Sequence, residues 1–225
     1  LACQTKLNGN IAIRRPVVDD LDIRIILKQF ADAPGSGLGQ EKDLAILFAD
    51  IENYTEFAGA FPAYDVVHVL NRYYQTMNEI IVQNRGIISD VAGDGILALF
   101  GAIEDSINPV LDAIHAVRSM NGALTQFNEY LSQMYDRHFA IRAGINFGSA
   151  VVGSFDTGRM SKVSAIGDEV NLASRIEAAN KEFGTRLLIS ESAYEKVQTD
   201  IESHEVYRTT LKGKTGKYAL YAVKM

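Results

Sequence analysis

Two aspartates, Asp50 and Asp94, stand where apolar stretches of the sequence end or turn. Asp50 closes the apolar run 44–51, which has the pattern of a strand buried on both faces, and Asp94 lies in an Asp-Gly turn between two strand-like runs. Both acids are expected at the rim of a sheet and converge if the strand and the hairpin are neighbours. Two carboxylates with room for substrate phosphates suit Mg²⁺ or Mn²⁺. The alternative is that Asp50 only caps a helix and Asp94 only forms a turn.

Two further groups could bind a phosphorylated ligand. Residues 51–55 lead into a helix, and free backbone N–H groups at such a start can hold a phosphate. Asn171 and Arg175 are four residues apart, so they share one face of a predicted helix. An amide and a guanidinium that project together suit a ribose and a polyphosphate. The alternative for this second pair is an ordinary solvated helix face.

Long amphipathic segments and short extended runs must position these residues. The sequence predicts long helices over 64–85 and 109–135, a helix over 169–182, and hairpins over 87–100, 138–153 and 206–223, the second turned at Gly148-Ser149. This order predicts an α+β fold with a ferredoxin-like βαββαβ core and extra hairpins, in which helices cover one face of one sheet.

The chain divides by composition into three parts. We predict an N-terminal edge segment over 1–30, which could be the remnant of an upstream domain, a linker over 31–42 and the main domain over 43–225. The linker is rich in Gly, Pro and Ser; a phosphate-binding glycine loop is the alternative, but a strand rather than a helix is expected after it. The first residue is Leu, so we interpret the chain as a piece of a longer one.

Charge and cysteine content exclude some classes of function. The chain has 22 Lys and Arg against 28 Asp and Glu, a formal net charge of −6, which argues against a large nucleic-acid-binding surface. Cys3 is the only cysteine, so no disulfide can form within the chain. No apolar run is long enough for a transmembrane helix. We therefore expect a cytoplasmic location, without membrane or nucleic-acid partners for this part of the protein.

Four sequence blocks together resemble the catalytic domain of the class III nucleotidyl (adenylate/guanylate) cyclases. They are Phe-Ala-Asp-Ile-Glu-Asn-Tyr-Thr at 48–55, Gly-Asp-Gly-Ile-Leu-Ala-Leu-Phe-Gly at 93–101, Arg-Ala-Gly-Ile-Asn-Phe-Gly at 142–148 and Gly-Asp-Glu-Val-Asn-Leu-Ala-Ser-Arg at 167–175. The blocks follow the order and spacing of that family over residues 43–225. Four ordered blocks are a far more specific signal than one motif.

The resemblance implies a homodimer whose two active sites lie across the interface. Each site would convert a nucleoside triphosphate to a 3′,5′-cyclic nucleotide and pyrophosphate with two Mg²⁺ or Mn²⁺ ions. The implied roles are metal binding by Asp50, Asp94 and the Ile51 carbonyl, phosphate binding by Tyr54, Thr55 and Arg142, ribose orientation by Asn171, charge stabilisation at the α-phosphate by the opposite subunit's Arg175, and γ-phosphate binding by Lys212.

The base-reading positions depart from the pattern of the ATP-specific members. Those members carry a lysine that contacts adenine N1, and this chain has Asp90 at the corresponding position. The second position that contacts the base in the family is Ser164 in this chain. A carboxylate cannot donate to adenine N1 but can accept from guanine N1–H and N2–H₂. The commonest family activity predicts ATP, whereas Asp90 favours GTP, and a pyrimidine triphosphate is a further alternative. Asp90 could also point away from the base.

Two weaker expectations complete this picture. Residues 1–4, Leu-Ala-Cys-Gln, resemble the last ligand segment of a plant-type [2Fe–2S] ferredoxin domain, which would make Cys3 a cluster ligand in a longer parent protein. An ordinary cysteine is the alternative. The competing functions are a non-catalytic cyclase-like signalling dimer and an RNA-binding sheet; the acidic composition disfavours the latter.

Overall fold

The apolar run that ends at Asp50 forms the central strand of the fold. The computed structural model describes residues 39–104, 106–156, 161–201 and 203–225. In chain order the elements are β1 (Gln40–Ile51), α2 (Tyr54–Ala60), α3 (Ala63–Gln83), β2 (Gly86–Ala92), β3 (Gly95–Phe100), α4 (Pro109–Tyr135), β4 (Ile141–Asp156), β5 (Ser161–Ile166), α5 (Asp168–Phe183), β6 (Leu187–Ser190), α6 (Glu191–Val197), β7 (Ser203–Thr209) and β8 (Tyr218–Val223).

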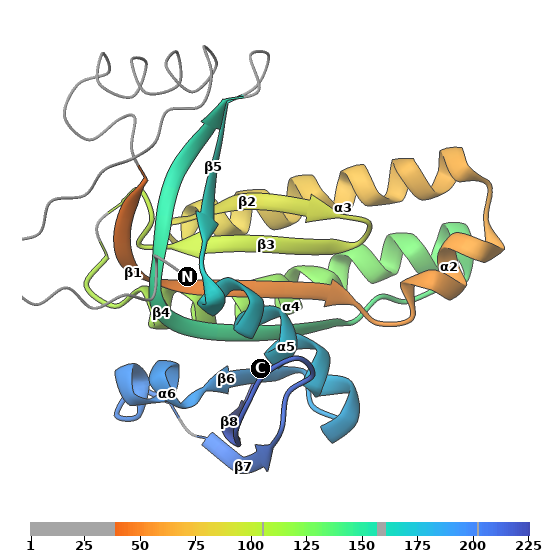
Figure 1. Cartoon of the computed structure of the whole chain (residues 1–225). Coiled ribbons are helices and arrows are strands. Elements are labelled where there is room, and N and C mark those ends of the chain that lie inside the picture. The colour runs from red at the N-terminus through yellow and green to blue at the C-terminus, as the bar shows by residue number, and fades with distance from the viewer. Residues whose placement is uncertain (1–38, 105, 157–160, 202) are drawn as a thin grey trace, which may run out of the picture. The chain divides into compact units, whose positions relative to one another are not determined.

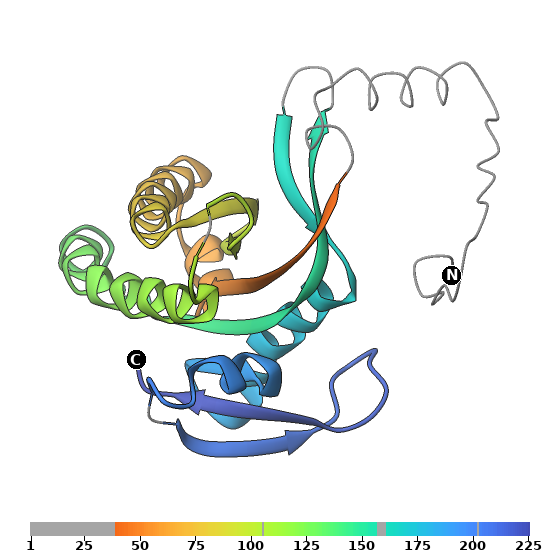
Figure 2. The same cartoon turned by 90° about the vertical axis from the view of Figure 1, so that its left-hand side faces the viewer.

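The strands form one mixed sheet in the order β2-β3-β1-β4-β6-β8-β7, with β5 paired to β4 (Figure 1). The first four strands and the helices α3 and α4 make the predicted ferredoxin-like βαββαβ core, in which β1 lies between β3 and β4. The α+β fold class is thereby confirmed. Strands β4 and β5 extend as a two-stranded ribbon away from α3 and α4 (Figures 1 and 2).

Helices cover both faces of the sheet, which corrects the expectation of one covered face. One face of β1, with Ala45 and Leu47, packs into a core shared with α3, α4 and α6. The other face, with Leu44 and Ile46, packs with Ala173 of α5. An uninterrupted apolar strand cannot leave either face in water, so a helix is needed on each side.

Strand β4 is continuous, so the predicted turn at Gly148-Ser149 is wrong. Residues 141–152 of β4 pair without interruption with residues 51–40 of β1, and Gly148 lies opposite Leu44. The side chain of Glu169, from helix α5, comes close to Gly148: a Cβ at this glycine would lie 2.8 Å from it. The glycine marks a close approach between elements and not a change of chain direction.

The N-terminal expectations fall largely outside the described residues. The segment 1–30, which includes Cys3, and most of the expected linker belong to the part of the chain that is not described. Residues 40–42, expected as the end of the linker, are already paired with β4 in strand β1. The strand begins earlier than predicted because its first residues are polar and largely exposed, so they show no apolar pattern.

Candidate active site

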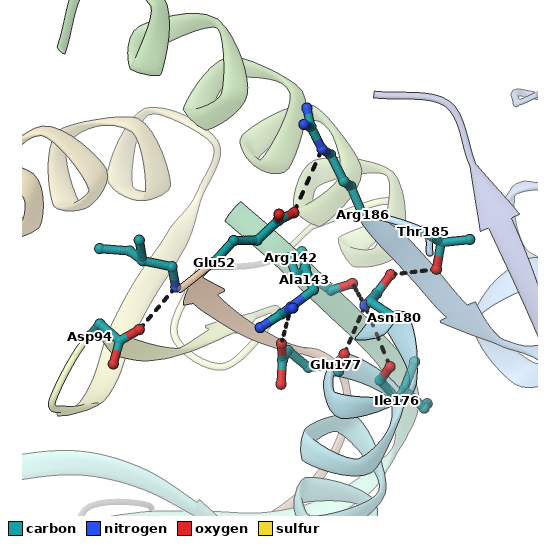
Figure 3. A network of polar contacts seen from close by, with 10 residues as sticks. Glu52, Asp94, Arg142, Ala143, Ile176, Glu177, Asn180, Thr185 and Arg186 are labelled. Atoms are coloured by element: carbon teal, nitrogen blue, oxygen red, sulfur yellow. Dashed lines mark hydrogen bonds and ion pairs between the residues drawn. The ribbon is translucent and has the colours of Figure 1, made fainter. Parts of the chain in front are cut away.

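The strand β1 and the β2–β3 turn bring Asp50 and Asp94 together. Asp50 is the penultimate residue of β1, and Asp94 follows Gly93, whose φ of 63° is the left-handed conformation that a tight turn requires. The backbone N–H of Ile51 donates a hydrogen bond to Asp94 Oδ2 at 3.2 Å (Figure 3). The hydroxyl of Tyr74, on α3, donates to the Gly93 carbonyl and ties the turn to the helix.

Among the described residues, no cationic side chain forms an ion pair with either carboxylate. Burial, and then the neighbouring Asp50 carboxylate, raise the pKa of Asp94 to about 7. Asp50 Oδ1 is buried and accepts no hydrogen bond from the described residues. An uncompensated acid pair of this kind is what a bound cation would neutralise.

The oxygen-only donor pair fits Mg²⁺ or Mn²⁺ better than a softer metal. Within the described ranges, no group of three or more His, Cys, Asp or Glu side chains is placed to hold a metal ion. Two carboxylates alone match the way Mg²⁺ is held with one or two protein acids, the other ligands coming from water and substrate phosphates. The site is therefore suited to a cation that arrives together with a phosphorylated ligand.

A cavity of about 360 Å³ opens beside the acid pair. Its other lining residues are Ile51, Asn53, Tyr54, Thr55, Glu56, Arg142 and Lys181. Asn53, with φ of 58°, turns the chain from β1 into the short helix α2, and so places Tyr54 and Thr55 at the cavity wall. The predicted phosphate-binding residues of this region therefore share one space with Asp50 and Asp94.

Arg142 reaches this cavity from β4, where it lies opposite Asp50. Its Nε is 3.6 Å from Glu177 Oε1 on α5, an ion pair too long for a hydrogen bond (Figure 3). Nε itself has no hydrogen-bond partner among the described residues. Burial and then the charge of Asp50 raise the pKa of Glu177, Arg142 opposes both effects, and the resulting pKa is about 7. Arg142 is thus held in place while its donors stay available to an anion.

Helix α5 is fixed closely against β4 by backbone contact and a buried amide. A Cβ at Gly144 would lie 2.2 Å from the backbone nitrogen of Glu177, so only glycine allows this approach. The Asn180 side chain, fully buried, donates to the Ala143 carbonyl at 2.8 Å and accepts from the Thr185 hydroxyl (Figure 3). These contacts fix the distance of α5 from β4 and the rotation of the helix relative to the acid pair.

Asn171 and Arg175 lie on the exposed side of α5. Successive helical residues are rotated by about 100°, so these two residues project away from the face that carries Glu177 and Lys181. Glu177 and Lys181 border cavities of the acid pair, whereas Asn171 and Arg175 border neither. The structure does not bring the predicted ribose- and phosphate-binding pair to Asp50 and Asp94 of the same chain.

The two base-reading positions approach each other between β2 and β5. A second cavity, of about 340 Å³, is lined by Asp90 together with both metal-position acids, Glu177 and an apolar set: Phe48, Ala49, Ala92, Gly95, Ile96 and Leu97. Asp90 forms an ion pair with Lys162 of β5, and this contact lowers the pKa of Asp90. Ser164 is half-buried two residues further along β5.

Lys212 is exposed in the connection between β7 and β8 and borders neither cavity. Its neighbour Lys214 contacts Asp168 through both the backbone carbonyl, at 3.0 Å, and the carboxylate. The connection is therefore held at the start of α5. The sequence argument missed Glu177, Lys181 and Lys162, because each reaches its place through contacts between distant elements that no local spacing reveals.

Comparison with known proteins shows the family of the chain. The sequence profile of the adenylate and guanylate cyclase catalytic domain matches residues 38–225. The chain belongs to this family. It is a nucleotidyl cyclase catalytic domain.

The cyclase domain is similar to proteins whose names specify different bases. It is 31% identical to an adenylate cyclase of Anabaena cylindrica over 90% of the chain and 41% of that protein. Among solved structures it superposes on the guanylyl cyclase Cya2 with a TM-score of 0.77 and 28% identity, covering 83% of this chain and 93% of that one. It superposes on the adenylyl cyclase CyaB from P. aeruginosa with a TM-score of 0.75 and 27% identity, covering 83% and 95%.

The chain spans less than half the length of the curated relatives that it matches first, with 41% and 28% of their sequences covered. None of the helices in the described ranges combines the length and apolar character needed to cross a bilayer.

Proposed function

We propose that this cyclase domain converts a nucleoside triphosphate to a 3′,5′-cyclic nucleotide and pyrophosphate at sites shared by two copies of the chain. The observation that supports it most is the meeting of Asp50 and Asp94 at one cavity, with a buried carboxylate oxygen that no described donor satisfies. Such an acid pair suits the binding of a triphosphate with its divalent cations.

Asp50 and Asp94 would hold two Mg²⁺ or Mn²⁺ ions, with the Ile51 carbonyl as a further ligand. When bound, these ions would supply charge neutralisation of the triphosphate and a lowered pKa for the attacking 3′-hydroxyl. The raised pKa of Asp94 supports this assignment, because a carboxyl group that is costly to ionise alone gains most from a neighbouring cation.

The protein's own cations would position the triphosphate. Arg142, already oriented by Glu177, would donate to the phosphates from the cavity wall. Lys212 borders neither cavity of its own chain, so it would bind the terminal phosphate at the acid pair of the other copy. In the reaction the 3′-oxygen attacks the α-phosphorus, the bond to the β-phosphate oxygen breaks, and pyrophosphate leaves with that electron pair. Negative charge grows on the phosphate oxygens, and fixed cations stabilise it.

The orientation of α5 supports a site completed by a second copy. Asn171 and Arg175 are exposed and line neither cavity of the acid pair of their own chain. In a two-fold dimer, the exposed side of one α5 can face the acid pair of the other chain, since such an interface uses the same surfaces twice. Asn171 would then orient the ribose and Arg175 would stabilise the α-phosphate in the transition state.

Substitution of either acid tests the metal assignment. Asp50→Ala and Asp94→Ala should each abolish formation of cyclic nucleotide and pyrophosphate with Mn²⁺, while the dimer seen by sedimentation stays intact. The exposed and uninvolved Lys224→Ala provides a control with unchanged turnover. Normal turnover in either aspartate variant would overturn the proposed role. A wild-type protein that binds triphosphate but forms no product would instead support a non-catalytic signalling module.

A further inference from the structure

Asp90 on β2 and the β5 residues Lys162 and Ser164 form what we call the base-reading corner. The ion pair between Asp90 and Lys162 changes which base this corner can recognise. Lys162 Nζ lies 2.6 Å from Asp90 Oδ1, and the backbone N–H of Val91 donates to the same oxygen at 2.9 Å. Both donors therefore use one carboxylate oxygen, which leaves Oδ2 as the atom of Asp90 that can accept from a ligand. The ammonium group of Lys162 retains further donors beside it.

The local fold fixes this pair in place. The pairing of β2 with β3 is irregular between Ile88 and Asp90, a bulge that changes the direction in which Asp90 projects. Ser89, buried at this bulge, donates a hydrogen bond from its hydroxyl to the Val163 carbonyl at 3.1 Å. Strand β5 is thus fastened to β2 at the residue next to Lys162. Since alternate residues of a strand share a face, Lys162 and Ser164 lie on the same side of β5.

A free carboxylate and this ion pair favour different purines. Guanine presents one acceptor, O6, beside two adjacent donors, N1–H and N2–H₂, and the two oxygens of one free carboxylate would accept from both donors. Adenine presents one acceptor, N1, and one donor, N6–H₂. An ammonium group beside a single accepting oxygen matches both groups of the adenine edge. With guanine the ammonium could donate to O6 and Oδ2 could accept from N1–H, but N2–H₂ would find no second oxygen of Asp90, and an unpaired polar group lowers affinity.

We propose that Lys162 is a specificity-determining residue that makes this corner read adenine, by donating to N1 while Asp90 Oδ2 accepts from N6–H₂. The lysine is supplied by β5, not by the position on β2 at which Asp90 stands. This inference rests on the proposed function, because it takes Asp90 as the base-reading residue of the nucleotide site. The Ser164 hydroxyl can donate or accept, so it serves either base.

The pair contributes little to folding, which makes it suitable for substitution. The side chains of Lys162 and Asp90 are 43% and 58% exposed, and exposed ion pairs contribute little to stability. Removal of Lys162 frees Asp90 Oδ1 for a second donor of the base. We therefore expect a folded variant with a changed preference between nucleotides.

The test compares ATP with GTP in wild type, Lys162→Ala and Lys162→Arg. Wild type should have the higher kcat/KM with ATP, Lys162→Ala should shift the ATP-to-GTP ratio toward GTP by about tenfold or more, and Lys162→Arg should restore much of the ratio. Both nucleotides are measured on the same preparation, so a partial loss of fold cancels. The control variant Lys224→Ala removes an exposed lysine outside the base-reading corner and should leave the ATP-to-GTP ratio unchanged.

A binding measurement separates this inference from the proposed function. Calorimetry with Mg²⁺ and 3′-deoxy-ATP or 3′-deoxy-GTP, which cannot cyclise, reports base preference without turnover. A ratio of affinities that moves toward the guanine analogue in Lys162→Ala supports the inference even if no product forms with any nucleotide. A wild-type preference for guanine, or a ratio that Lys162→Ala does not change, overturns it while leaving cyclisation itself intact.

Discussion

The acid pair of Asp50 and Asp94 dominates the electrostatics of the domain at the scale of single residues. Asp94 accepts from the Ile51 N–H but lies in a partly buried position beside a second carboxylate, and its pKa is raised to about 7. Burial and repulsion outweigh the two backbone hydrogen bonds, from Asp94 itself and from Ile51, that favour its charge. The domain therefore carries a local instability that a cation would relieve.

This instability predicts an unusual dependence of stability on pH. An unfolded Asp94 would titrate near its ordinary value of 3.8, and the folded one near 7. Between these values the folded state holds the extra proton, so stability is present at the acidic end and falls as pH rises through this window. The metal-free domain should have a lower Tm at pH 8 than at pH 5.5, and Mn²⁺ at pH 8 should recover the difference.

Asp94→Asn is the matched variant for this effect. The amide oxygen can still accept from the Ile51 N–H, but the repulsion with Asp50 is gone. At pH 8 without metal the variant should have a Tm higher by a few degrees, about 2–4 °C for each kcal/mol gained in a domain of this size. Thermal unfolding followed by circular dichroism measures it. A pH profile identical to that of wild type would contradict the proposed source of the instability.

At the scale of elements, the packing of α5 on β4 decides where the site residues stand. Gly144 allows the helix backbone to approach, and the Asn180 amide links the two elements. Glu177 and Arg142 meet only because this distance and rotation are fixed. A small change in the contact would therefore affect both stability and the phosphate-binding side of the cavity.

Gly144→Ala should destabilise the domain by about 1–3 kcal/mol, because its Cβ would overlap the backbone of α5 and not a flexible side chain. Urea denaturation measures the loss of unfolding free energy. Gly122→Ala in α4 is the control: nothing lies within 4 Å of the added Cβ, and alanine in a helix stabilises by about 0.5–1 kcal/mol. Equal effects of the two substitutions would contradict the close-approach argument.

At the scale of the whole molecule, one chain separates the residues that the proposed site unites. The acid pair faces a cavity of its own chain, while Asn171 and Arg175 are exposed on α5. The proposed site is therefore complete only with two copies. The same arrangement makes defective chains able to complement each other.

Mixing an Asp50→Ala chain with an Arg175→Ala chain should restore activity that neither has alone. In the mixed dimer one site carries both defects and the other carries none. If subunits exchange freely, half of the dimers are mixed, so the recovered activity should be roughly one quarter of wild type. Turnover before and after mixing measures this. Absence of rescue, with subunit exchange shown independently, would mean that each chain builds its own site.

The sequence alone determined the family, the ferredoxin-like core and the identity of the acid pair, because four ordered motifs and strong apolar patterns are local properties of the chain. It also placed α4 at its observed bounds. The turn predicted at Gly148 was wrong: this glycine lies within a strand, close to the Glu169 side chain of a helix that follows later in the sequence. Asp90 shows the same limit, since its charge partner Lys162 lies on another strand.

Only the tertiary structure decided which faces are covered, what α5 presents to the acid pair and what surrounds the base-reading residues. These depend on the distance and rotation of elements that are far apart in sequence. Side-chain chemistry can be read from residue types, but the partner that modifies it is chosen by packing. The preference for a base is therefore a property of the folded corner and not of Asp90 by itself.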